Sequence, residues 1–297
     1  MTVPIQSSST VSIENELDWC AAEVVGDELL VSVTRNYDDE KREGIIALIT
    51  GSITREIQIV QEPCAWYDSF QMQLVQGGKF YMGAQSIWTD SVNYDKNAFT
   101  IEAPVHEVLL SDFYICSVEV TQYQWEAAMG YNPSQIQGED LPVTDISWDD
   151  ANEFINVLNE KTGLNYRLPY EAEWEYAAKG GRMSASYLYS GSSVLSACGW
   201  YYSNSSSVVH DIAGKYPNEL GLYDMSGNVR EWCLDWMEYY TSYSVEDPTG
   251  PSEGELKINR GGSWATPAVN CRNTYRHVDS PSSTASDLGF RLVLPVD

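Results

Sequence analysis

Basic residues are scarce in this sequence. Its 297 residues include 17 Lys and Arg against 43 Asp and Glu, a formal net charge of −26 at pH 7. Nucleic acids and anionic membranes are bound through clustered basic side chains, so this composition argues against both as partners. A basic, neutral or metal-bridged ligand fits the charge better, although acidity that serves only solubility is an equal alternative.

Long apolar runs are also lacking. No segment approaches the ~20 apolar residues that a membrane helix needs. The opening "MTVPIQSSST" does not have the charged start and apolar core of a signal peptide. We therefore expect a soluble chain without direct membrane insertion, and a removed leader or a lipoprotein anchor outside this chain stays open.

Metal-binding and nucleophile motifs are missing as well. The six cysteines form no CxxC pair and have no zinc-like spacing to the three histidines His106, His210 and His277. No GxSxG elbow or phosphate-cradling glycine loop is present. An even cysteine count permits disulfides in an oxidising compartment, but the sequence does not assign their pairing.

The pattern of the chain predicts two domains. Residues 11–61 contain short runs of alternating apolar and polar residues, which indicate strands. "EPCAWYDSFQ", residues 62–71, loses this alternation and is the expected linker. We place the first domain at residues 1–64 and the second at 65–297.

Three helices are predicted in the second domain. One helix follows Thr121 in "TQYQWEAAMG". Another, "WDDANEFINVLNEKTG", follows the capping residue Ser147 and closes at Gly163. A third begins in "PYEAEWEYAAKGG", with Pro169 expected in its first turn. The alternating glutamates of this last segment are interpreted as caps and packing anchors.

The first domain resembles the BACON-type domains of Bacteroidetes through the spaced elements "DWC", "LLVSVTRN", "KREGIIALITG" and "IQIVQ". The resemblance implies a small all-β, immunoglobulin-like sandwich. Such domains are associated with a suspected carbohydrate-binding role, and a simple spacer is the alternative for this one.

The second domain resembles the formylglycine-generating enzyme (sulfatase-modifying factor) family, roughly from Gln73 to Pro295. The motifs occur in the family's order: "GGKFYMG", "PVHEVLLSDFYICSVEVTQYQW", "LPVTDISWDDANEFINVLNEKTGLNYRLPYEAEWEYAAKGG", "NELGLYDMSGNVREWCLDW", "NRGGSW" and "SDLGFRLVLP". This resemblance implies a loop-rich α+β domain of the C-type lectin fold. Since that fold carries oxidases, accessory proteins and variable binding proteins, it does not decide the function.

The resemblance implies a missing copper site. The family's oxidases hold copper between two cysteines, because soft thiolates select Cu(I). The matching positions here are Thr266 and Cys271, so we expect neither copper nor formylglycine production. Cys271 remains a weak catalytic candidate, and the resemblance also suggests that it forms a disulfide with Cys233.

The resemblance implies a calcium loop in "GLYDMSGNVREW". Its matching ligands are Asp224, the backbone carbonyls of Gly227 and Val229, and Glu231, a set of hard oxygen donors suited to Ca²⁺. The alternative is a metal-free turn held by hydrogen bonds from Asn228.

Small, polar and aromatic residues near the end of the chain indicate a binding surface between Trp264 and Ser286. The expected ligand-binding residues are Trp264, Thr266, Asn270, Asn273, Tyr275, His277 and Asp279. The sequence therefore favours an exported, periplasmic or cell-surface protein that binds a protein or glycan without catalysis.

Three alternatives stay open. The "RGGSW...CR...R...GFR" frame is similar to the variable region of retroelement-diversified proteins, which a near-repeat of the coding segment differing at adenines would support. A redox enzyme with Cys271 as its sole thiol is a second possibility. A structural subunit of a gliding or pilus machine is the third.

Overall fold

The structure, a computed structural model, describes residues 2–4, 11–33, 40–61 and 65–296. The chain divides into two compact units, Met1–Ser69 and Phe70–Asp297. Cys64 and the first residues of the expected linker lie outside the described residues.

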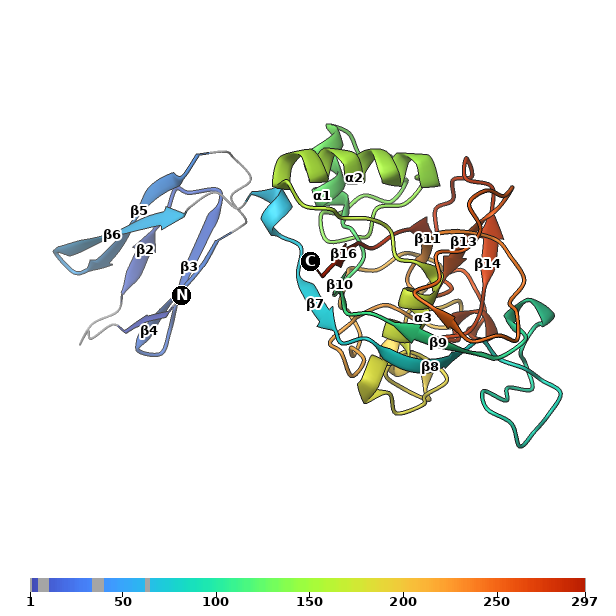
Figure 1. Cartoon of the computed structure of the whole chain (residues 1–297). Helices are drawn as coiled ribbons and strands as arrows, with labels where there is room; N and C mark the ends of the chain where they lie inside the picture. The colour runs from blue at the N-terminus through green and yellow to red at the C-terminus, as the bar shows by residue number, and fades with distance from the viewer. Residues whose placement is uncertain (1, 5–10, 34–39, 62–64, 297) are drawn as a thin grey trace. The chain divides into compact units, whose positions relative to one another are not determined.

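Two antiparallel sheets build the first unit (Figure 1). Their strand orders are β1-β4-β3 and β2-β5-β6, with β1 (Thr2–Pro4), β2 (Ser12–Glu14), β3 (Cys20–Val25), β4 (Glu28–Val33), β5 (Arg42–Thr50) and β6 (Ile53–Gln61). Apolar side chains from both sheets meet in one core of Cys20, Leu29, Val31, Ile46 and Ile59. Burying one face of each sheet against the other is what stabilises a sandwich. The expected all-β first domain is confirmed.

Short strands joined by long loops make up most of the second unit. They are β7 (Met72–Val75), β8 (Gly78–Met82), β9 (His106–Leu110), β10 (Phe113–Cys116), β11 (Arg230–Trp236), β12 (Val245–Glu246), β13 (Lys257–Arg260), β14 (His277–Asp279), β15 (Leu288–Gly289) and β16 (Val293–Pro295). The sheets have the orders β16-β10-β7, β14-β13-β11-β15 and β12-β9-β8. Because β10 pairs with both β7 and β16, the end of the unit lies close to its beginning.

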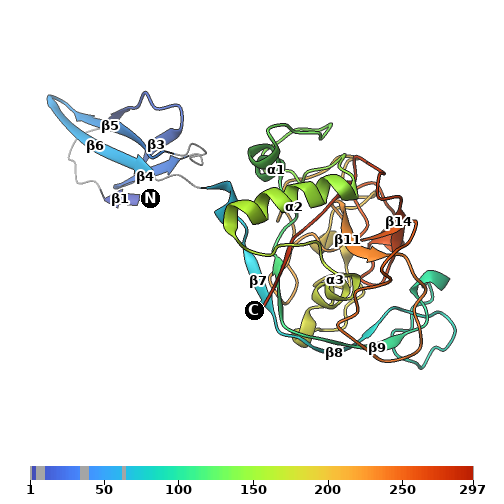
Figure 2. The same ribbon diagram turned by 45° about the horizontal axis from the view of Figure 1, so that its top comes forward.

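Helices in this unit lie both at its outside and in its interior, where every residue of the third helix is buried. They are α1 (Gln122–Met129), α2 (Trp148–Thr162), α3 (Glu171–Ala178) and α4 (Leu195–Cys198), with 3₁₀ turns η1 (Trp66–Asp68), η2 (Thr100–Glu102), η3 (Gly181–Met183) and η4 (Ala268–Cys271). Figure 2 shows α2 running across the outside of the unit next to α1. The capping prediction for α2 is confirmed, since Ser147 accepts a hydrogen bond from the Asp150 amide and Gly163 ends the helix at φ 71°.

The helix α3 starts two residues later than the predicted first-turn position of Pro169. Pro169 lies before the N-cap residue Tyr170 and outside the helix. Side chains fix this start, because the Tyr170 amide donates to Glu173 and the Glu171 amide donates to Asp235 at 2.8 Å each. The interpretation of these glutamates as caps and anchors is confirmed.

Buried ion pairs tie the loops of the second unit together. The pairs are Glu102–Arg272, Glu171–Arg276, Glu175–Arg260 and Glu231–Arg291. In each pair both side chains are at most 4% exposed. A loop-rich domain has few regular backbone hydrogen bonds, so these charge-assisted contacts position segments that lie far apart in sequence.

Candidate functional site

Thr266 and Cys271 lie side by side, as the motif positions predict. The Thr266 Oγ1 atom is 3.6 Å from the Cys271 Sγ atom. Thr266 is itself fixed by Ser263, whose backbone amide donates to its hydroxyl at 2.8 Å. A threonine hydroxyl is a hard ligand that does not ionise. The Thr266 and Cys271 pair therefore offers a single thiol to a soft metal ion.

Cys271 is a poor nucleophile in this position. Its side chain is fully buried at the end of η4, beside Leu195 and Cys198. Burial raises the pKa of the Cys271 thiol to about 11, and the hydrogen bond with Thr266 opposes this rise. Since the thiolate is the reactive form, Cys271 is protonated and shielded at neutral pH.

The suggested disulfide between Cys233 and Cys271 is wrong. Both residues are free thiols in the structure. Cys233 lies on β11 within the main core, with Ile258 and Trp174, whereas Cys271 belongs to a separate apolar cluster with Cys198. The two thiols therefore serve as small apolar side chains in different parts of the interior.

Cys271 should resist alkylation in the native protein. We expect iodoacetamide to modify it at least about a hundredfold more slowly than in the urea-unfolded chain, because the thiolate is scarce and the atom is buried. Peptide mass mapping after timed exposure measures this ratio. Rapid labelling of Cys271 in the folded chain would contradict the assignment of a buried, protonated thiol.

The predicted surface residues differ in how far their side chains are packed into the protein. The Trp264 ring packs against Leu141, Val209 and Val229, and its Nε1 atom donates to the Ser286 carbonyl at 3.2 Å. The half-buried Tyr275 ring meets Phe99 edge to face at 5.7 Å between centroids. Asn270 and Thr266 are also partly exposed. This surface therefore combines fixed aromatic rings with polar groups.

His277 and Asp279 lie on β14 beside Arg230. The Arg230 guanidinium donates to Asp279 at 2.6 Å, and the His277 Nδ1 atom is 3.2 Å from the same carboxylate. Burial would raise the pKa of Asp279, but the contacts with His277 and Arg230 outweigh it and lower that pKa to about 2. Asp279 is thus a charged anchor for β14, and His277, with its side chain 38% exposed, is the more accessible group.

Asn273 differs from its neighbours because its side chain is buried rather than displayed. The residue is 2% exposed, and its Nδ2 atom donates to the Tyr187 carbonyl at 3.1 Å. Its Oδ1 atom has no hydrogen-bond partner. Leaving such an acceptor unsatisfied costs about 1–3 kcal/mol.

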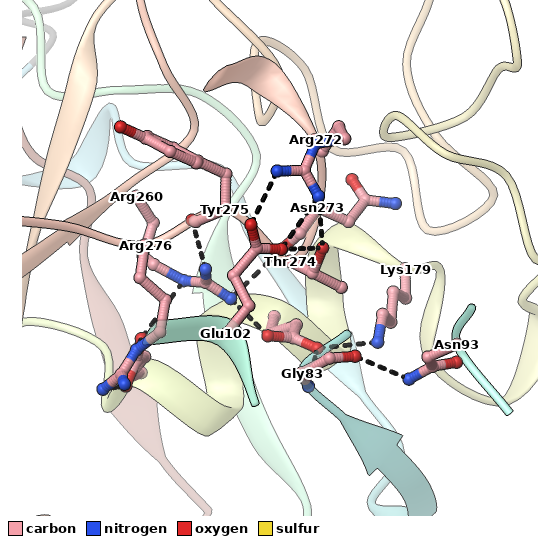
Figure 3. A network of polar contacts seen from close by, with 12 residues as sticks. Gly83, Asn93, Glu102, Lys179, Arg260, Arg272, Asn273, Thr274, Tyr275 and Arg276 are labelled. Carbon is pink, nitrogen blue, oxygen red and sulfur yellow. Dashed lines mark hydrogen bonds and ion pairs between the residues drawn. The ribbon is translucent and has the colours of Figure 1, made fainter. Parts of the chain in front are cut away.

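A cavity of about 380 Å³ opens beside Asn273 and Thr274. Its walls come from β8, from the 92–95 loop and from the 184–188 loop. Thr274 belongs to a polar network, and Figure 3 shows Glu102 of this network facing both Arg272 and Thr274. Arg272 donates to the two Glu102 carboxylate oxygens at 2.6 and 2.8 Å, and the Thr274 hydroxyl donates to Glu102 at 2.7 Å. This network holds one side of the cavity rigid.

The predicted calcium loop has the required tight turn but not the complete ligand set. Asp224, Gly227 and Asn228 all have left-handed backbones. The buried Asp224 carboxylate accepts from the Ala213 amide through Oδ2 at 2.7 Å, while its Oδ1 atom has no partner. An unsatisfied buried carboxylate oxygen fits a cation ligand.

Glu231, the last of the expected ligands, is largely occupied by other partners. Arg291 donates to both of its carboxylate oxygens at 2.6 Å, and the Trp174 indole donates to one of them at 2.6 Å. These three donors leave one lone-pair site free, on Oε1, so Glu231 has room for at most one contact to a calcium ion. Glu231 is therefore an anchor of the core in this structure.

Glu119 is the acidic residue that the sequence analysis missed. It is fully buried, and the Asn228 side chain donates to it at 3.3 Å. Burial and then the charges of Asp224 and Glu231 raise its pKa well above the usual range. Its place between Val118 and Val120 in "SVEVTQ" was the available signal. Among the described residues, however, no group of three or more His, Cys, Asp or Glu side chains is arranged to hold a metal.

Family models match both units of the chain. The model described as "Sulfatase-modifying factor enzyme 1-like domain" matches residues 62–296. The model described as "Putative binding domain, N-terminal", the BACON domain, matches residues 8–62. The chain belongs to the sulfatase-modifying factor enzyme 1-like family.

Proteins similar to this chain include a chaperone protein, an enzyme and a variable protein. The chain is 32% identical to the chaperone protein LppX of Paenibacillus barcinonensis over 275 residues, covering 76% of this chain and 89% of that protein. It is 30% identical to the formylglycine-generating enzyme of Streptomyces coelicolor, covering 61% of each. The solved Treponema denticola variable protein 1 is 30% identical, with a TM-score of 0.68, over 86% of this chain and 99% of that one.

These comparisons confirm the expected fold, a loop-rich α+β domain of the formylglycine-generating enzyme type preceded by a sandwich. They do not select one activity, because the relatives include an enzyme and a variable protein. In the described part of the chain, no helix is both long and apolar enough to cross a membrane.

Proposed function

We propose that this chain is a non-catalytic ligand-binding protein that works in the periplasm or at the cell surface. The observation that supports this most strongly is the pair Thr266 and Cys271, in which a hydroxyl faces a buried thiol at 3.6 Å. A two-thiolate copper site cannot form there. In this proposal the fold presents side chains to a ligand and does not oxidise a substrate.

The proposed contact surface is the segment from Trp264 to Ser286, with a protein or glycan as ligand. Tyr275 and His277 are its accessible rings, and their centroids lie 6.5 Å apart. Two rigid rings next to small polar residues give contact area at little cost in conformational entropy. The likeness to the Treponema denticola variable protein 1 supports the further proposal that residues of this segment are exchangeable.

We also propose that the loop after Asp224 binds calcium. Asp224 supplies an unsatisfied oxygen and Glu119 a second buried carboxylate close by. The backbone carbonyls of Gly227 and Val229 would complete the set in place of Glu231. When bound, the ion would neutralise buried negative charge and fix the turn.

The contact surface is tested by capture on arrays. Full-length protein is applied to an array of bacterial and mucin-type glycans and to a displayed peptide library. We expect selective capture that the Tyr275→Ala/His277→Ala double variant reduces by about tenfold or more, since hot spots concentrate in exposed aromatic residues. The control Tyr216→Ala removes a ring that is 76% exposed elsewhere on the unit. Capture that is equal in all three proteins would contradict the proposed surface.

A further inference from the structure

We propose that the cavity beside Asn273 is a binding site for a neutral saccharide of one or two rings. The proposal rests on the proposed binding function, but it assigns a site distinct from the partly exposed rings of Tyr275 and His277. With about 380 Å³, the cavity has the size of small-molecule pockets in proteins.

Tyrosine rings form the walls of this cavity. Tyr81, Tyr94 and Tyr187 line it from three separate segments and are 48%, 39% and 42% exposed. Singly exposed rings are common on protein surfaces, but three rings gathered around one cavity offer flat contact area on several sides of a ligand. The C–H face of a pyranose ring packs against such flat rings, and its hydroxyls remain available for hydrogen bonds.

The charges around the cavity are neutralised within the protein. Lys179 donates to the Glu175 carboxylate and to the Tyr81 carbonyl, at 2.6 and 2.9 Å. Asp95 accepts from Arg272 at 2.8 Å. Both side chains already have a partner of opposite charge, so neither is left unpaired for an ionic ligand. The net charge of −26 also repels anions. These facts favour a neutral ligand.

The remaining polar groups of the cavity suit hydroxyl groups. The Asn93 side-chain amide donates to the Tyr81 and Gly83 carbonyls at 2.7 and 2.8 Å. Its amide oxygen is therefore the group that can accept from a ligand. Asn273 also lines the cavity, and its amide oxygen has no partner within the protein but is itself buried. Ser184 and Ser186 line the opposite loop with hydroxyls, which donate as well as accept. Side-chain acceptors and hydroxyls between aromatic rings match the groups of a sugar.

The experiment measures saccharide binding by the full chain. Cellobiose, chitobiose, maltose, lactose and mannobiose are tested at millimolar concentration by saturation-transfer NMR, followed by calorimetry for any that bind. We expect at least one to bind, and Tyr94→Ala and Tyr187→Ala to weaken it roughly three- to tenfold each. Tyr216→Ala is the matched control for loss of an exposed ring, and circular dichroism checks that every variant folds.

Each other outcome overturns the proposal. Binding of none of the saccharides, or binding unaffected by the Tyr94 and Tyr187 variants, would contradict it. Binding abolished only by Tyr275→Ala/His277→Ala would leave the proposed function standing and move the sugar to that surface. Selective binding of a charged glycan or a peptide in this cavity would contradict the stated ligand class.

Discussion

Replacement of Glu231 by alanine is expected to lower the free energy of unfolding of the second unit by about 3–5 kcal/mol. Glu231 and Arg291 are both 0% exposed and form two hydrogen bonds of 2.6 Å. Without the carboxylate, Arg291 keeps the Cys116 and Tyr223 carbonyls as its hydrogen-bond partners in the described part of the chain, and the Trp174 indole loses its acceptor. An uncompensated buried charge is among the most destabilising changes a single substitution can make.

Urea unfolding followed by tryptophan fluorescence measures this effect. Glu107→Ala is the matched control, because Glu107 forms an ion pair with Lys79 at the surface and its loss is expected to change stability little. A double variant, Glu231→Leu/Arg291→Met, should recover part of the loss, since apolar residues of similar volume replace buried pairs well. A Glu231→Ala protein as stable as the Glu107→Ala control would contradict the anchoring role.

The same measurement separates anchoring from metal binding. If Glu231 is an anchor, its replacement destabilises the protein equally with calcium and with a chelator. Asp224→Asn should instead remove any stabilisation that calcium adds, because a ligand that binds only the folded state raises stability with its concentration. A Glu231 effect that vanishes in chelator would restore Glu231 to the calcium site.

The sequence predicted local structure well where a few neighbouring residues decide it. Ser147 and Gly163 define the ends of α2 through their own backbone geometry, and both were placed correctly. Thr266 and Cys271 were predicted to be neighbours from family motifs, and they are. The start of α3 was missed because Asp235, which is 64 residues away from Glu171, accepts the first amide hydrogen.

Long-range partners could not be predicted from the sequence. Glu231 pairs with Arg291, which is 60 positions away in the sequence. Glu102 pairs with Arg272, which is 170 positions away. The proposed disulfide failed for the same reason, because only packing decides that Cys271 lies against Cys198 and not near Cys233. The buried position of Asn273 likewise follows from the 184–188 loop closing over it.

Conversion of Thr266 to cysteine is expected to create a copper(I) site. The Thr266 Oγ1 atom already lies 3.6 Å from the Cys271 Sγ atom, so a sulfur at the same position would give two thiolates that one Cu(I) ion can bridge. Metal binding also lowers the thiol pKa, which offsets the burial that keeps Cys271 protonated. We expect the affinity for Cu(I) to rise at least about a thousandfold, since soft thiolates are the ligands that select this ion.

The most direct test of a non-catalytic function is therefore Cu(I) binding by the reduced protein, measured by competition with a chromogenic chelator. Thr266→Cys is compared with the natural chain, and Thr266→Cys/Cys271→Ser is the control that has only one thiol at the site. The account predicts no tight copper in the natural chain, a gain in Thr266→Cys, and loss of that gain in the control. Tight Cu(I) binding by the natural chain that depends on Cys271 would contradict the account and identify a redox site.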